Sequence, residues 1–168
     1  MRIGIVSDTH GRADRLRAAL EALAARGAQA VVHCGDVGSP ACLELLGASP
    51  MAAYAVAGNM DRRGEQFAEA ARSAGVTFDR DVVEVPLGEG QSLAVTHGDD
   101  RSLLTELVAG GRHRYVCHGH THSRRDEAFG PCRLINPGAL RSPKHPPRPS
   151  AALLDTDTDT VEFLDVPT

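Results

Sequence analysis

The sequence predicts an α/β fold, with a helix-covered sheet in the first half of the chain and a more strand-rich second half. Up to residue 75, short apolar runs rich in β-branched residues alternate with stretches of helical periodicity, which is the order expected when helices cover a sheet. After residue 80 strand-like runs dominate, with one short helical pattern among them. This late half is consistent with two sheets that pack face to face.

Alternating strands and helices account for the first half. The strands are expected at 2–7, 30–36 and 52–59, because each is a short apolar run that ends in polar residues or in Gly-Asp or Gly-Asn. Each strand is followed by a helix: one that places Leu16, Leu20 and Leu23 in a single apolar stripe, one over 42–46, and one over 62–74 that ends at Gly75.

The second half predicts a hairpin, a short helix and four more strands. The hairpin joins 81–87 to 92–99 through the turn GEG, and the helix contains Leu103, Leu104 and Leu107. The further strands are expected at 114–119, 132–136, 151–155 and 161–165. Four prolines within 142–150 indicate an exposed loop.

Length and composition limit the classes of protein to which this chain can belong. A chain of 168 residues is expected to form one domain, 1–168, with a core that needs no disulfides. The net charge of −4 and the single lysine, Lys144, leave no basic field for nonspecific nucleic-acid binding. No stretch has the length of a membrane span, and the first apolar run is too short for a signal peptide. The four cysteines form no CxxC pair, so we expect buried, reduced thiols and a cytoplasmic protein.

Side chains of the kinds that bind metal ions follow five of the expected strands. Ligand sites in α/β sheets form beyond the carboxyl ends of strands, so we expect these side chains to converge. They are Asp8 and His10 after the first strand, Asp36 after the second, Asn59 after the third, His97 after the hairpin, and His120 and His122 after 114–119.

Each motif alone is weak evidence for a metal site. SDTH is also typical of a turn that begins a helix, and CGD and GN occur in ordinary turns. A lone His97 after an apolar strand is also typical of a packed core residue. The stretch HGHTHS is stronger, because alternating histidines seldom arise for packing, and the five motifs together predict metal binding.

The number of candidate ligands indicates two metal ions. One zinc-like ion takes about four ligands, so seven ligands with one shared carboxylate fill two ions. Oxygen and nitrogen ligands without a thiolate suit Mn, Fe, Zn, Ni or Co, of which we expect Mn. Two ions about 3.5–4 Å apart lower the pKa of a bridging water and hold a phosphoryl group for in-line attack by the resulting hydroxide.

The motifs DTH, GD, GN, THGD and GHTH, in this order, resemble those of the calcineurin-like metallophosphoesterases. The chain length and NPGAL at 136–140 resemble the small single-domain prokaryotic phosphodiesterase branch of that family. The motifs extend from residue 6 to about 140, so the resemblance covers most of the chain. It implies a four-layer αββα sandwich of two mixed β-sheets flanked by helices.

The resemblance also implies how the ligands divide between the ions. One ion takes Asp8, His10, Asp36 and His122, and the other takes Asp36, Asn59, His97 and His120. Asp36 is then the bridge, and the residues expected to carry catalysis are Asp36, Asn59 and His97.

Two positions depart from the pattern of this family. Many members read GNH, and that histidine is held to assist the phosphate or the leaving group, whereas this chain has Met60. Because methionine cannot donate a proton, leaving groups that need protonation are expected to react poorly unless His118 or His33 substitutes. Ala139, where the branch usually has serine, is expected to alter a hydrogen bond near the site.

Two further polar residues leave alternatives open. Asp61 is expected either to orient a neighbouring group or to cap the helix that follows it. Arg141 either reaches a substrate phosphate or is simply solvated.

The sequence therefore predicts a binuclear metal-dependent phosphodiesterase that acts on a small phosphoester substrate. One alternative is a non-catalytic protein-binding scaffold with the same fold, which Met60 favours and the complete ligand set disfavours. A second alternative is a phosphomonoesterase or nucleotidase. A membrane or nucleic-acid partner is not expected, and the sequence leaves the oligomeric state open.

Overall fold

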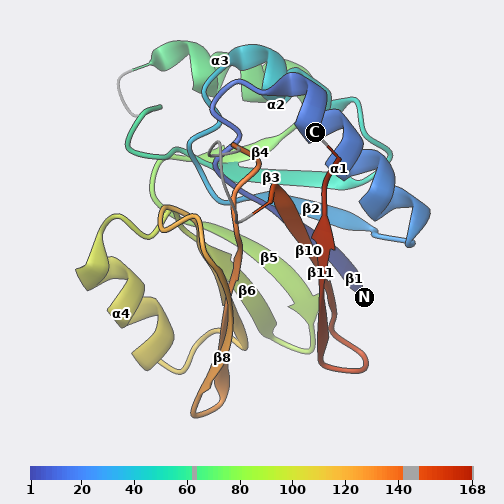
Figure 1. Cartoon of the computed structure of the whole chain (residues 1–168). Helices are drawn as coiled ribbons and strands as arrows, with labels where there is room; N and C mark the ends of the chain where they lie inside the picture. Colours follow the sequence, from blue (N-terminus) through green and yellow to red (C-terminus); the bar gives the residue numbers. More distant parts are fainter. Residues whose placement is uncertain (62–63, 142–147, 168) are drawn as a thin grey trace.

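The computed structural model describes residues 1–61, 64–141 and 148–167, and Figure 1 shows its strands and helices in chain order. The strands are β1 (Arg2–Val6), β2 (Ala30–His33), β3 (Ala52–Val56), β4 (Thr77–Asp79), β5 (Val83–Gly88), β6 (Gln91–Val95), β7 (Tyr115–Cys117), β8 (Arg124–Phe129), β9 (Cys132–Pro137), β10 (Ser150–Asp155) and β11 (Thr160–Asp165). The helices are α1 (Ala13–Ala25), α2 (Pro40–Gly47), α3 (Glu65–Ala74) and α4 (Arg101–Ala109).

The first sheet has six strands in the order β11-β10-β1-β2-β3-β4. The strands β1 to β4 run parallel, with Ile5 opposite Val32 and Val32 opposite Tyr54. The hairpin of β10 and β11 lies antiparallel beside β1. Strands β1 and β2 are covered on both faces, which explains why they consist of short continuous apolar runs without polar alternation.

The second sheet has five strands in the order β5-β6-β7-β9-β8. Its central strands β6, β7 and β9 run parallel. The edge strands β5 and β8 pair antiparallel with β6 and β9. Both sheets are therefore mixed, as the family resemblance implies.

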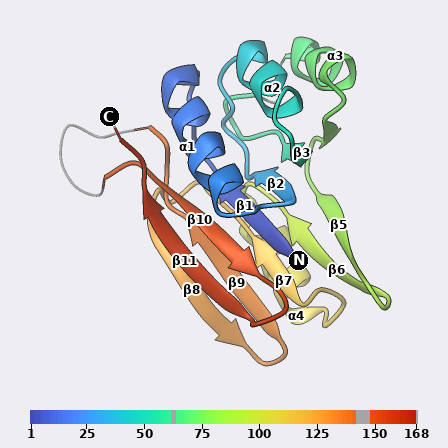
Figure 2. The ribbon, with the colours of Figure 1, turned by 90° about the vertical axis from the view of Figure 1, so that its right-hand side faces the viewer.

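The two sheets pack face to face, and helices cover their outer faces (Figures 1 and 2). Between the sheets lies a core that includes Ile5, Val32 and Val95. A second core, with Leu16 and Leu43, joins α1, α2 and α3 to the six-stranded sheet, and a smaller one lies beneath α4 on the five-stranded sheet. The order helix, sheet, sheet, helix confirms the four-layer αββα sandwich.

The sequence does not predict two of the strands. β4 has only three residues, too few for a pattern. β8 reads RRDEAF and is almost entirely exposed at the sheet edge, so it lacks the apolar alternation by which a half-buried strand is recognised. The expected helix over 62–74 begins at Glu65 in the described part of the chain, and most of the proline-rich stretch 142–150 lies outside the described residues.

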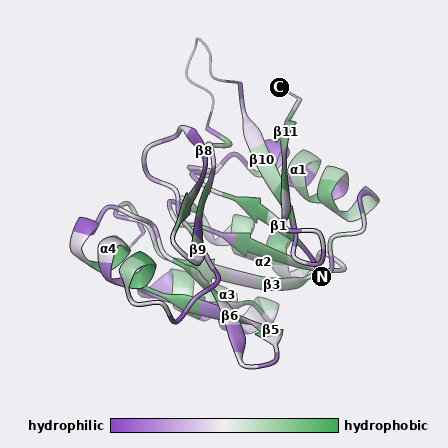
Figure 3. Ribbon diagram, turned by 90° about the horizontal axis from the view of Figure 1, so that it is seen from below, coloured by the Kyte–Doolittle hydropathy of each residue, from purple (hydrophilic) through white to green (hydrophobic). Residues whose placement is uncertain are grey.

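The distribution of hydrophobic residues agrees with the layered arrangement of helices and sheets. In Figure 3 the helices α1 and α4 each have a hydrophobic and a hydrophilic side, as expected for helices that pack on one face of a sheet. None of the helices in the described part of the chain combines the length and apolar character needed to cross a membrane.

Candidate metal centre

The carboxyl ends of five strands meet at one edge of the sandwich. β1, β2 and β3 run parallel in one sheet, and β6 and β7 run parallel in the other. The loop after each of these strands carries at least one of the predicted ligands. Contacts between the loops bring all seven side chains together, in the two groups described next.

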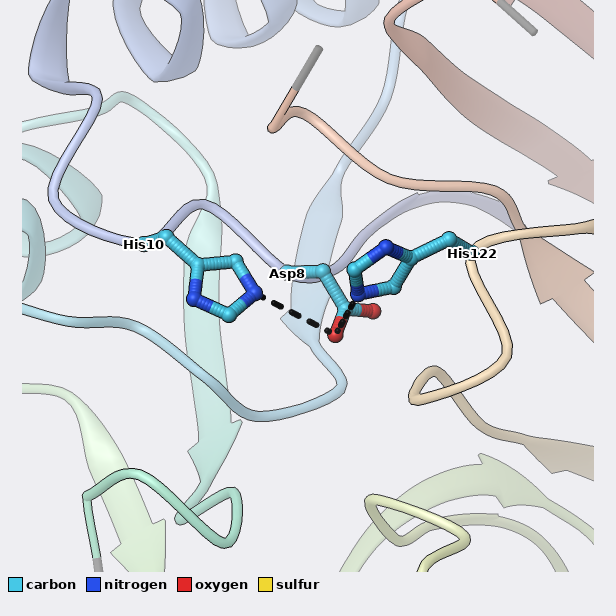
Figure 4. Close-up of side chains that lie close together, drawn as sticks. All are labelled: Asp8, His10 and His122. Carbon is cyan, nitrogen blue, oxygen red and sulfur yellow. Dashed lines mark hydrogen bonds and ion pairs between the residues drawn. The ribbon is translucent and has the colours of Figure 1, made fainter. Parts of the chain in front are cut away.

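The first group lies around Asp8, which follows β1. Figure 4 shows His10 and His122 on either side of the Asp8 carboxylate. His122 Nε2 lies 3.1 Å from Asp8 Oδ1, and His10 Nε2 lies 3.9 Å from the same oxygen. The two imidazole rings meet edge to face, with their centroids 5.6 Å apart. Two nitrogen atoms and a carboxylate oxygen thus converge on one place.

Asp36, after β2, stands between the two groups. Its Oδ2 lies 3.6 Å from His10 Nε2, and its Oδ1 lies 3.6 Å from His97 Nε2. The side chain is almost fully buried, and the backbone N–H of Met60 donates to Oδ1 at 2.9 Å. The two carboxylate oxygens therefore face different histidines, which is the arrangement that a bridging ligand needs.

The second group consists of Asn59, His97 and His120. His97 Nε2 lies 3.0 Å from Asn59 Oδ1, and the His97 and His120 rings meet edge to face with centroids 5.2 Å apart. The other ring nitrogen of His97, Nδ1, lies 2.8 Å from the carbonyl oxygen of Cys34. Because a carbonyl can only accept, Nδ1 carries the proton and Nε2 is left free to bind a cation.

Two sets of three histidine and aspartate side chains have donor atoms close enough together to hold a metal ion. They are Asp8, His10 and His122, and Asp8, Asp36 and His97, with the donor atoms of each set within 4.8 Å of one another. Asp8 is common to both sets, so the carboxylates of Asp8 and Asp36 lie side by side at the centre of the site. The pairing of His10 with His122 and of His97 with His120 agrees with the division that the family resemblance implies, and the assignment of ligands stays a prediction.

Most of these residues have a left-handed backbone. In the described part of the chain seven non-glycine residues have positive φ, and five of them are candidate ligands: Asp8, His10, Asp36, His120 and His122. Aspartate and histidine tolerate this conformation better than most residues, but it still costs on the order of 1 kcal/mol or more each. Such strain, concentrated in one set of side chains, is typical of a functional site.

Two glycines lie where ligand loops approach each other closely. A Cβ on Gly58 would lie 2.0 Å from Asp36 Oδ1, and one on Gly119 would lie 1.9 Å from Ser7 Oγ. Neither position has room for a side chain. The glycine in GN therefore lets two ligand loops of the six-stranded sheet approach each other, and the glycine in HGH lets a loop of the five-stranded sheet approach the loop after β1.

Asp61 ties two of the ligand loops together. Its buried carboxylate accepts hydrogen bonds from the backbone N–H groups of Val37 (2.8 Å), Gly38 (2.9 Å) and Gly58 (3.0 Å). The N-cap of α3 is Gly64, so of the two predicted roles Asp61 orients its neighbours and does not cap the helix.

Sequence reasoning missed two other residues that hold the ligands. Ser7 Oγ donates to Asp8 Oδ2 at 2.6 Å. Asn136, at the end of β9, donates from Nδ2 to the carbonyl oxygen of Gly119 at 2.8 Å and so holds the HGHTHS loop. Asn136 lies in the stretch NPGAL, which was the signal available for it in the sequence.

Burial disfavours the protonated form of His33 and His118, the two residues expected to substitute for the missing proton donor. Both side chains are buried, and burial lowers the pKa of each to about 4. The backbone N–H of Gly35 donates to His33 Nδ1 at 3.2 Å, so His33 Nε2 carries the proton and donates to Thr9 Oγ1 at 2.6 Å. Met60, two-thirds exposed, stands at the edge of the site without an acidic proton.

The electrostatics of the first group suit a cation. Burial alone would raise the pKa of Asp8, but hydrogen bonds with His122 and Ser7 outweigh it and lower the pKa. Burial lowers the pKa of His10 despite the nearby carboxylates of Asp36 and Asp8. The hydrogen bond to Asp8 raises the pKa of His122. Asp8 is thus charged and His10 neutral near pH 7, which are the forms that bind metal ions.

The donor set fits divalent cations. His10 Nε2 is buried and has no hydrogen-bond partner, although it faces two carboxylates, and a cation between them would satisfy all three groups. The donors are oxygen and nitrogen atoms. All four cysteines are free and buried, as predicted, and the thiol of Cys34 lies in the core between the sheets. This combination suits Mn, Fe, Zn, Ni or Co.

Known proteins resemble this chain over most of its length. A family model described as the calcineurin-like phosphoesterase superfamily domain matches residues 1–159. A phosphodiesterase of Methanocaldococcus jannaschii is 31% identical over 144 residues, which cover 82% of this chain and 83% of that protein. A probable metallophosphoesterase of Bacillus subtilis is 30% identical, with 98% of this chain and 91% of that protein covered. The solved structure of an archaeal phosphodiesterase superposes with a TM-score of 0.87 and 28% identity, covering 99% of this chain and 100% of the other.

Proposed function

This chain belongs to the calcineurin-like phosphoesterase superfamily, a family of hydrolases, and we propose that it is a binuclear metal-dependent phosphodiesterase for a small phosphoester substrate. The observation that carries the proposal is the position of Asp36. Its two carboxylate oxygens face His10 on one side and His97 on the other, each at 3.6 Å. One carboxylate shared by two groups of ligands is the feature that distinguishes a two-ion site from a one-ion site.

The residues divide into two ligand sets in this proposal. One ion would be held by Asp8, His10, Asp36 and His122, and the other by Asp36, Asn59, His97 and His120. When bound, two such ions supply an activated water at neutral pH and neutralise charge on the phosphoryl oxygens. Of the metal ions that oxygen and nitrogen ligands bind, we propose manganese.

The chain itself orients these groups before any substrate arrives. Cys34 O fixes the tautomer of His97, and the N–H of His120 donates to Asp8 Oδ2 at 3.1 Å. The hydrogen bonds to Asp8 keep its carboxylate ionised and in place. Such preorganisation lowers the barrier because the site does not need to rearrange during the reaction.

Met60 limits the substrates that the site can process. It is exposed at the edge of the site, where it cannot protonate a leaving group. General-acid help is typically worth about 10²–10⁴-fold in rate, so the absence of an acid at this position favours diesters whose leaving group departs as a stable anion. We therefore propose phosphodiesters with good leaving groups in preference to phosphomonoesters.

Turnover of bis(p-nitrophenyl) phosphate with added Mn²⁺ tests the proposal. We expect hydrolysis by the wild-type chain and loss of activity in Asp36→Ala and His97→Ala, with Asp14→Ala, an exposed carboxylate on α1, as the matched control. The diester should be turned over faster than p-nitrophenyl phosphate. A metal-loaded wild-type chain that hydrolyses neither compound would leave only the scaffold alternative.

The compartment proposed for this chain is the cytoplasm. The four cysteines are free and buried, which suits a reducing environment. The formal net charge of −4 supports a small-molecule substrate over a nucleic acid.

A further inference from the structure

The segment after β9 runs alongside the first ligand loop. The N–H of Leu140 donates to Ser7 O at 3.0 Å, and the N–H of Arg141 donates to Asp8 O at 2.8 Å. Leu140 is fully buried, and its own carbonyl accepts from Arg15 Nη1 at 3.0 Å. Figure 4 shows this ribbon, which leads on from β9, passing beside Asp8 and His122. The backbone of Arg141 is therefore fixed next to a candidate metal ligand.

The side chain of Arg141 is exposed. Within the described part of the chain its guanidinium makes no hydrogen bond or ion pair, whereas that of Arg12, also close to the site, pairs with Asp14 at 3.5 Å. A free arginine whose backbone is held in place loses less entropy on binding a ligand than one on a mobile loop.

We propose that Arg141 binds a phosphoryl oxygen of the substrate at the edge of the metal centre. This inference rests on the proposed function and adds a substrate-binding residue to it. A guanidinium presents a planar fork of N–H donors that matches two oxygens of a phosphate, and it remains charged at every pH of interest. A phosphodiester carries its negative charge on its two non-bridging oxygens, so Arg141 would hold the substrate by the part that every phosphodiester shares.

The test compares Arg141→Ala, Arg141→Lys and the matched control Arg12→Ala, all loaded with Mn²⁺. Arg141→Ala keeps the backbone N–H that donates to Asp8 O, so its metal content and Tm should equal those of the wild type. We expect inorganic phosphate, titrated by calorimetry, to bind about 10- to 100-fold more weakly to Arg141→Ala, as expected for loss of a charge-assisted hydrogen bond. KM for bis(p-nitrophenyl) phosphate should rise by a similar factor with a smaller change in kcat, and Arg141→Lys should fall between.

The outcomes separate this inference from the proposed function. Suppose the wild type hydrolyses no ester but binds phosphate, and only Arg141→Ala binds phosphate more weakly. The proposed function then fails and the role of Arg141 stands. If the wild type is active and Arg141→Ala matches Arg12→Ala in both phosphate affinity and KM, the inference is wrong. A lower metal content or Tm in Arg141→Ala would also overturn it, because the arginine would then serve the fold. A wild type that neither binds phosphate nor hydrolyses esters would overturn both.

Discussion

Asp61 illustrates how single buried side chains set the geometry of the site. Its carboxylate accepts three backbone N–H groups from the loops that carry Asp36 and Asn59. Neither loop has regular secondary structure to hold it, so the distance between these two ligands depends on this carboxylate and on the hydrogen bond from the N–H of Met60 to Asp36.

Replacing Asp61 by asparagine should weaken metal binding. The amide NH₂ cannot accept a hydrogen bond, so at least one buried N–H would lose its partner, at a cost of about 1–3 kcal/mol in the free energy of unfolding. We expect lower Mn²⁺ affinity in a calorimetric titration and a lower urea midpoint. Asp100→Asn is the control, since Asp100 also accepts two backbone N–H groups, but at the exposed N-terminus of α4. Equal Mn²⁺ affinity in the two variants would show that Asp61 does not position the ligands.

His33 should make stability depend on pH. Burial lowers its pKa from 6.5 to about 4, so between these values the unfolded chain binds a proton that the folded chain does not. The free energy of unfolding should therefore be highest above pH 6.5 and fall as the pH drops to about 4, by roughly 3 kcal/mol from this residue. Urea unfolding of metal-free protein from pH 7.5 to 5 measures the slope. His33→Gln, which keeps a donor for Thr9 but does not titrate, should flatten it; an unchanged slope would contradict the assignment.

At the scale of the elements, the positions of the candidate ligands depend more on the loops after the strands than on the strands themselves. The predicted strands 30–36 and 52–59 end earlier in the structure, at His33 and Val56, and the residues beyond them turn to present Asp36 and Asn59. These turns approach closely because Gly58 has no side chain, and its backbone is not in the left-handed region.

Gly58→Ala should therefore disrupt the site through a steric clash of the new Cβ, without backbone strain. The new Cβ would meet Asp36 Oδ1 at 2.0 Å, so we expect loss of bound Mn²⁺. Gly47→Ala is a matched control, because its Cβ would meet the carbonyl oxygen of Ala74 at 2.1 Å between α2 and α3, away from the ligands. Both variants should unfold more readily, measured by thermal denaturation. Only Gly58→Ala should lose metal, measured by elemental analysis, and retention of metal there would refute this account of the loop.

What could be predicted from the sequence follows from this difference between strands and loops. Apolar runs identify buried strands, and polar residues at their ends identify the seven candidate ligands. The edge strand β8 has no such pattern, because its side chains face solvent on most of its length. The hydrogen bonds of Asp61 and Asn136 join segments far apart in the chain, so no local pattern reveals which groups these two residues hold. Ser7 bonds its neighbour Asp8, but a serine beside an aspartate is too common to identify that role.

At the scale of the whole molecule, the sandwich brings two independent sheets to one site. Asp8, Asp36 and Asn59 come from the six-stranded sheet, and His97, His120 and His122 come from the five-stranded sheet. The core between the sheets, with Ile5, Val32 and Val95, sets the distance between these two halves. Metal binding should therefore be coupled to correct packing of the two sheets.

The most direct test is anomalous X-ray diffraction from crystals of the chain grown with Mn²⁺. We expect two peaks, about 3.5–4 Å apart, with the Asp36 carboxylate between them. One peak should lie against Asp8, His10 and His122, and the other against Asn59, His97 and His120. A single peak, or no peak with His120 and His122 turned away from Asp36, would contradict the binuclear centre and with it the proposed hydrolysis.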